Sequence, residues 1–75
     1  MPKPPLVSGK EAVRALQHLG FVFIRQQGSH AILRRDAPEG ARGCVVPMHP
    51  EIQPGTLRGM LKQAGVSVED FTAQL

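Results

Sequence analysis

The chain has 75 residues, with nine Lys and Arg against six Asp and Glu, and its formal net charge is +3. A single domain of this length buries roughly 60% of the surface that its unfolded chain exposes, which disfavours a deep, enclosed active site. An open sheet face or a long partner interface is the more natural working surface. The mild positive charge is compatible with nucleic acid or an acidic protein, although many small proteins reach it without binding a polyanion.

The cysteine count and the hydropathy of the chain exclude several further classes of protein. A lone cysteine, Cys44, excludes an internal disulfide and the paired cysteines of a zinc ribbon or finger, and this suits a reducing compartment. No stretch of about 20 apolar residues could span a membrane. The proline-rich start also lacks the apolar region of a signal peptide. We therefore expect one cytoplasmic domain over residues 1–75, in which residues 1–7 form an extended arm.

The first element in chain order is a helix from about Ser8 to Leu19. Ser8 and Glu11 have the spacing of a capping box, in which each side chain bonds the backbone amide of the other. One side of the helical wheel is apolar, and it carries Ala12, Val13, Ala15, Leu16 and Leu19. Gly20 follows as a left-handed cap residue and ends the helix.

Two strands and a tight turn come next. The aromatic and β-branched run 21–26 predicts a strand, 27–29 a turn, and 30–35 a second strand. Alternation puts His30, Ile32 and Arg34 on one face of this second strand, and Ala31, Leu33 and Arg35 on the other. Because both faces carry apolar residues, the sequence leaves open which one packs on the helices.

The second half of the chain predicts one more strand and one more long helix. Residues 36–43 have the composition of a loop, 44–47 form a short strand that Pro47 ends, and 48–53 are a connection. A helix then runs from about Pro54 to Gly65, because apolar residues recur at helical spacing. Those residues are Leu57, Met60, Leu61 and Ala64. A brief helical turn from Ser67 through Phe71 completes the chain.

The order of elements predicts an α+β fold of the α-β-β-β-α type. Three antiparallel strands with both long helices on one face leave the other face open to a ligand. Double-stranded-RNA-binding domains share this architecture, although architecture alone does not settle function.

His30 is the strongest candidate for chemistry. It stands at the mouth of the predicted hairpin, with Arg25 and Arg34 nearby. An imidazole exchanges protons near neutral pH, so it could deprotonate the 2′-hydroxyl of RNA, which then attacks its own phosphate. The alternative is an ordinary polar strand residue, which is what a histidine beside a turn usually is.

The residues around His30 also have two interpretations each. Ser29 could bind a phosphate or orient His30, and Gly28 could supply a positive φ or let the substrate backbone approach; both are also ordinary turn residues. Arg25, Arg34 and Arg35 are candidates for phosphate contacts, although solvated arginines are the default on a strand.

The other histidines are weaker candidates. His49 could be a second acid or base, or it could cap the helix that follows, and we favour a structural role. His30 and His49 are the only conceivable metal pair, and two histidines without a third ligand make a poor zinc site. His18 falls on the polar side of the first helix, where we expect a solvated surface residue.

Five segments together resemble the HicA toxins, also called the YcfA-like family. They are Ser8-Gly9-Lys10-Glu11, Leu19-Gly20-Phe21, Arg25-Gln26-Gln27-Gly28-Ser29-His30, Val46-Pro47-Met48-His49, and Gly55-Thr56-Leu57-Arg58 followed by Leu61-Lys62-Gln63-Ala64-Gly65. They cover nearly the whole chain, in order and with similar spacing. The loop 36–43 is the one minor departure, because it is longer and richer in glycine than the tight hairpin of many relatives.

The resemblance implies a double-stranded-RNA-binding-domain-like fold and a metal-independent ribonuclease that acts on mRNA without a cofactor. It identifies His30 as the catalytic histidine and places Arg25, Gly28 and Ser29 in the matched segment, so these three and Arg34 are the expected substrate-binding residues. It also implies a HicB-type antitoxin that covers the histidine and through which the toxin reaches operator DNA.

Two other functions remain open on the residues alone. A binding module of the double-stranded-RNA-binding type would show salt-dependent RNA affinity without cleavage. A degenerate toxin that only binds its antitoxin would show neither RNA affinity nor toxicity.

Overall fold

A computed structural model describes residues 5–75, so residues 1–4 of the predicted arm lie outside the described residues. The elements are α1 (Gly9–His18), β1 (Val22–Gln27), β2 (His30–Arg35), β3 (Arg42–Pro47), α2 (Pro54–Ala64) and α3 (Val68–Thr72). The sheet has the order β1-β2-β3 with both pairs antiparallel, which confirms the predicted α+β class and element order.

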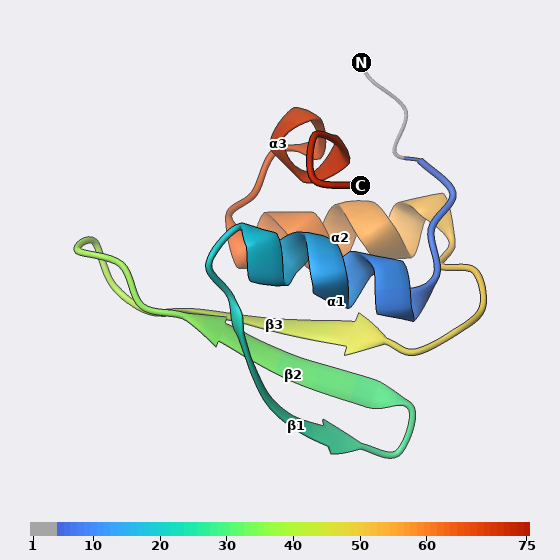
Figure 1. The fold of residues 1–75 in the computed structure, drawn as a ribbon, viewed down its shortest axis with the longest axis horizontal. Coiled ribbons are helices and arrows are strands. Elements are labelled where there is room, and N and C mark those ends of the chain that lie inside the picture. The colour runs from blue at the N-terminus through green and yellow to red at the C-terminus, as the bar shows by residue number, and fades with distance from the viewer. Residues whose placement is uncertain (1–4) are drawn as a thin grey trace.

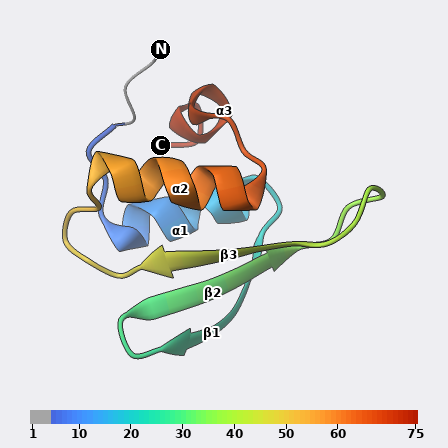
Figure 2. The same ribbon diagram turned by 180° about the vertical axis from the view of Figure 1, so that it is seen from behind.

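The helices gather on one side of the sheet, and α3 packs beyond the two long ones (Figures 1 and 2). Helix α2 lies along β3, where the Gln63 side-chain oxygen accepts a hydrogen bond from the Val45 amide at 3.4 Å. The Val45 amide, on the outer edge of β3, is therefore hydrogen-bonded to a side chain of α2. Strand β1 is the strand furthest from the helices and forms the opposite edge (Figure 1).

Helix α1 begins and ends as its sequence predicts. The Glu11 amide donates to Ser8 Oγ at 3.1 Å, and the Ser8 amide donates to Glu11 Oε1 at 2.9 Å, so the capping box is complete. The regular helix ends at His18, one residue before the predicted limit, and Gly20 has a φ of +97°. Gly65 ends α2 in the same way, with a φ of +72°.

Packing settles which face of β2 meets the helices. Ala31 and Leu33 are completely buried, whereas His30 and Arg34 are exposed. Their neighbours in the core come from every helix, from β3 and from the connection between β3 and α2. The largest are Leu16, Cys44, Val46, Ile52, Leu57, Leu61 and Phe71. The face that carries His30 is therefore the open one.

Arg35 belongs to the covered face and is engaged there. Its Nη1 donates to the Leu19 carbonyl at 3.2 Å, and its guanidinium carbon lies 4.9 Å from the centre of the Phe21 ring. These contacts tie β2 to the connection between α1 and β1. Arg35, which the sequence offered as one candidate for a phosphate contact, is instead engaged within the fold.

The strands differ from the predicted ones at their ends and at one irregularity. β1 contains a bulge between Phe23 and Arg25, where Ile24 has no partner in β2. β3 begins at Arg42, two residues earlier than expected, because Arg42 and Gly43 pair with the end of β2. The loop between β2 and β3 is correspondingly shorter and projects from the body of the molecule (Figure 1).

Candidate functional site

The turn between β1 and β2 holds the candidate site in place. Gly28 has a φ of +60°, which confirms the predicted positive φ. Its carbonyl accepts a hydrogen bond from Gln26 Nε2 at 3.1 Å. The Ser29 carbonyl accepts a hydrogen bond from the Met48 amide at 2.6 Å, so the turn is also bonded to the segment that follows β3.

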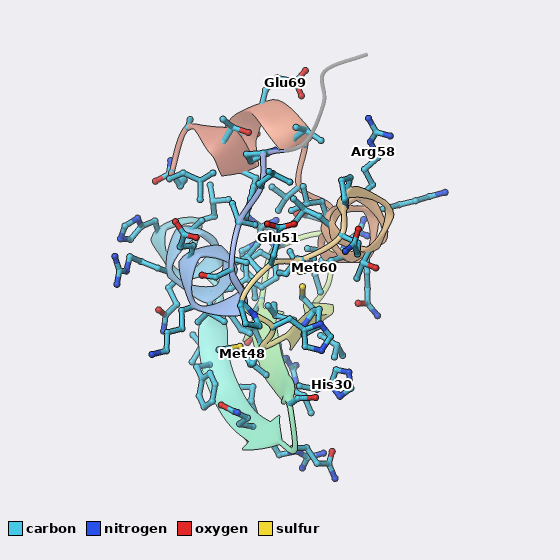
Figure 3. The ribbon with its side chains drawn as sticks, turned by 90° about the vertical axis from the view of Figure 1, so that its right-hand side faces the viewer. His30, Met48, Glu51, Arg58, Met60 and Glu69 are labelled. Carbon is cyan, nitrogen blue, oxygen red and sulfur yellow. The ribbon has the colours of Figure 1, made fainter. Side chains whose placement is uncertain are left out.

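His30 follows this turn directly and faces away from the helices. It pairs with Gln27 of β1 and with Pro47 of β3, so it lies in the middle strand at the end of the sheet. Its side chain is exposed, and Figure 3 shows the ring standing clear of the sheet on the side away from Met48. The imidazole is therefore accessible from solvent without any movement of the core.

Arg25 shares the open face with His30. It pairs with Ile32, and His30 pairs with Gln27, so the two side chains are diagonal neighbours on adjacent strands. Such positions lie about 7–8 Å apart at Cα, within reach of long side chains. The bulge at Ile24 sets this placement, because it shifts the alternation of β1 by one residue.

Arg34 is on the same face but lies apart from this group. It is four residues from His30 along β2, which is about 13 Å at roughly 3.3 Å per residue. Its Nε also forms an exposed ion pair with Asp36 at 3.0 Å. The structure thus brings together Arg25, Gly28, Ser29 and His30, and it does not bring Arg34 to them.

A pocket of about 370 Å³ opens at the same end of the sheet, beside the turn. It lies among the start of α1, the end of β1 and the segment after β3, and its lining residues are Ser8, Lys10, Gln26, Met48, His49 and Pro50. Gly9 allows these segments to meet. A Cβ at Gly9 would stand 2.6 Å from both the Met48 Cα and the Pro47 carbonyl oxygen, and the Gly9 amide donates to the His49 carbonyl at 2.9 Å.

His49 is exposed at this pocket and does not cap α2. The N-cap residue of α2 is Gln53, which makes no side-chain hydrogen bond to the helix, so the capping role proposed for His49 is wrong. Among residues 5–75, no group of three or more His, Cys, Asp or Glu side chains is arranged to hold a metal ion.

The pocket as a unit was not predicted from the sequence. Lys10, Gln26 and Met48 all lie in segments that carry the family resemblance, yet nothing in their spacing shows that they meet. One signal could have pointed to these residues: each lies in a segment that resembles the family, and none belongs to the predicted core.

Cys44 lies on the covered face and takes no part in this site. It is 1% exposed, and burial raises the pKa of its thiol to about 11. At neutral pH it therefore behaves as a small apolar core residue.

The fold defines a small α+β protein in which helices cover one face of a three-stranded antiparallel sheet and the other face, with the exposed His30, stays open. A model of the family described as the HicA toxin of bacterial toxin-antitoxin systems matches residues 9–66, well over half of the chain. The chain therefore belongs to the HicA toxin family, a family of mRNA interferases whose members have an antitoxin partner. No curated protein matches the chain. Over residues 5–75, no helix has the length and apolar character needed to cross a membrane.

Proposed function

We propose that this protein is a metal-independent endoribonuclease that cleaves mRNA, with His30 as the general base. The observation that carries the proposal is the position of His30, an exposed imidazole at the end of the open sheet face with Arg25 as its diagonal neighbour. Membership of a family of mRNA interferases supports the choice of RNA as substrate.

The nucleophile in this reaction is the 2′-hydroxyl of the RNA itself, so the protein has mainly to transfer protons and stabilise the negative charge on the phosphate. His30 accepts the proton of a ribose 2′-hydroxyl, and the 2′-oxygen forms a bond to the adjacent phosphorus. The bond between phosphorus and the 5′-oxygen of the next nucleotide breaks, and that oxygen takes up a proton. The products are a 2′,3′-cyclic phosphate and a 5′-hydroxyl end.

The neighbours of His30 have supporting roles in this proposal. Arg25 binds the phosphate and stabilises the negative charge that builds on it in the transition state. Ser29 donates a hydrogen bond to a phosphate oxygen, and Gly28 leaves room for the RNA backbone, since a Cβ there would meet nothing within 4 Å. Arg34 contacts a phosphate further along the strand, because it is too far from His30 to share the reacting one.

We further propose that a HicB-type antitoxin inhibits the protein by covering this face. Three apolar side chains share it with His30, namely Val22, Ile32 and Val45, and β1 offers a free edge beside them. Hydrogen exchange of the complex with a HicB-type protein should show protection of β1 and β2 amides. Protection confined to α2 and α3 would contradict this arrangement.

The chemistry can be tested with a defined RNA in the presence of EDTA. The purified protein should cut the RNA and leave cyclic phosphate and 5′-hydroxyl ends. A matched RNA with one 2′-deoxyribose at the cleaved position should lose that cut and keep the others, because its nucleophile is absent. Cutting at the deoxy position would contradict the mechanism, and an intact RNA would favour the binding module.

A further inference from the structure

The pocket beside the turn shares its walls with the candidate active site. Gln26 lines the pocket and is the direct neighbour of Gln27, which pairs with His30. Met48 lines it too, and its amide holds the Ser29 carbonyl. The open sheet face and the pocket therefore meet at one end of the sheet, on either side of the same turn.

The chemistry of the lining suits a nucleotide. Its volume of about 370 Å³ falls at the lower end of the range for small-molecule sites, about 300–1,000 Å³. Met48 and Pro50 offer apolar surface to the face of a base, and the exposed His49 ring can stack on it. Lys10 adds a positive charge, and none of the residues lining the pocket is acidic.

Hydrogen-bonding capacity is also left over for the edge of a base. Gln26 uses its Nε2 on the Gly28 carbonyl, which leaves its Oε1 as an acceptor. The Ser8 hydroxyl, in contrast, accepts from the Glu11 amide and hydrogen-bonds the Glu11 carboxylate, so the capping box already engages it. The Gln26 acceptor favours a base whose edge presents a donor, and it can therefore distinguish one base from another.

We propose that this pocket binds one nucleotide of the RNA, next to the bond at which His30 acts. The base lies against Met48, His49 and Pro50, and Lys10 binds the phosphate of that nucleotide. The inference rests on the proposed ribonuclease function and deepens it, since Gln26 becomes a residue that determines which sequences are cut.

The test uses the intact protein, with uridine 3′-monophosphate, adenosine 3′-monophosphate and inorganic phosphate as probes. None of the three can be cleaved, so binding is measured apart from catalysis. In nitrogen-15 NMR titrations, at least one nucleotide should shift the amides of Lys10, Gln26, Met48 and His49, and phosphate alone should shift them far less. Equal shifts with phosphate, or shifts confined to other residues, would overturn the nucleotide pocket.

Two variants sharpen the test. Lys10→Gln should weaken nucleotide binding by about tenfold, as expected when one charge-assisted contact is lost. Lys62→Gln makes the same change of charge on α2, outside the pocket, and should leave binding unchanged. Equal weakening by both would show that net charge alone attracts the nucleotide, and would contradict the site.

Cleavage assays distinguish failure of this inference from failure of the proposed function. Gln26→Ala should redistribute cuts among the sequences of a mixed RNA pool while cleavage continues. An unchanged pattern of cuts, with the parent active, would overturn the pocket alone. Nucleotide binding at the pocket by a parent that cuts no RNA would overturn the ribonuclease.

Discussion

The two faces of β2 serve different purposes, although they alternate along a single strand of six residues. Ala31 and Leu33 are completely buried and pack against the helices, whereas His30 and Arg34 are exposed. Neighbouring residues therefore differ in what their substitution should change. The covered face should govern stability, and the open face should govern the proposed activity.

The largest expected effect on stability comes from a matched pair of substitutions in β2. Leu33→Ala removes a fully buried side chain and should lower the free energy of unfolding by about 2–5 kcal/mol. Ile32→Ala, one residue away on the open face and only partly buried, should cost about 1 kcal/mol. Urea denaturation followed by circular dichroism measures both. Equal losses would contradict the assignment of the two faces.

A smaller effect is expected at the start of α1. Ser8→Ala removes the side-chain cap and should cost about 1 kcal/mol in the free energy of unfolding. Lys10→Ala, in the first turn but outside the capping box, is the control and should change stability less. A loss at Ser8 no larger than that at Lys10 would show that the cap contributes nothing.

The same cap predicts a dependence of stability on pH. Hydrogen bonds from the Ser8 backbone and then its side chain lower the pKa of Glu11 in the folded protein. A carboxyl with a depressed folded pKa stabilises the protein above its unfolded pKa, and this contribution is lost as the pH falls through the folded value. Acid titration of the thermal midpoint should show this loss in the parent and a weaker one in Ser8→Ala. Identical pH profiles would contradict the linkage.

The substitution that we expect to disturb the structure least is Val45→Cys, which allows thiol labelling to compare the two faces of β3. Cys44 is buried with a pKa of about 11, and its neighbour Val45 is 40% exposed on the open face. In the variant Val45→Cys, Ellman's reagent at pH 7.5 should label the introduced thiol at least about 100-fold faster than Cys44, because it attacks thiolates. In urea the two rates should converge. Fast labelling of Cys44 in the folded parent would place it outside the core.

Local signals in the sequence predicted the parts of the fold that depend on neighbouring residues. The Ser8 and Glu11 capping box, and the glycines at 20 and 65, defined helix limits to within one or two residues. Each works through contacts three or four residues apart, or through its own φ. The alternation of β2 likewise placed His30 and Arg34 on one face correctly.

Features that depend on distant contacts could not be predicted in this way. The pattern of β2 did not show which face is covered, because that depends on where the helices pack. Neither the bulge at Ile24 nor the pairing of Arg42 with Arg35 has a local signature, and the bulge decides where Arg25 lies. The residues that line the pocket come together only in the folded protein, and they are Ser8, Lys10, Gln26, Met48, His49 and Pro50.

The most direct test of the central claim is the rate of RNA cleavage by His30→Ala. The imidazole is exposed and lies outside the core, so the variant should fold with a thermal midpoint close to that of the parent. Its cleavage rate should fall by at least about 100-fold, the usual contribution of a general base. His18 is also exposed and lies on α1, away from the open face, so His18→Ala should retain the parental rate. A folded His30→Ala protein that cleaves RNA as fast as the parent would contradict the account.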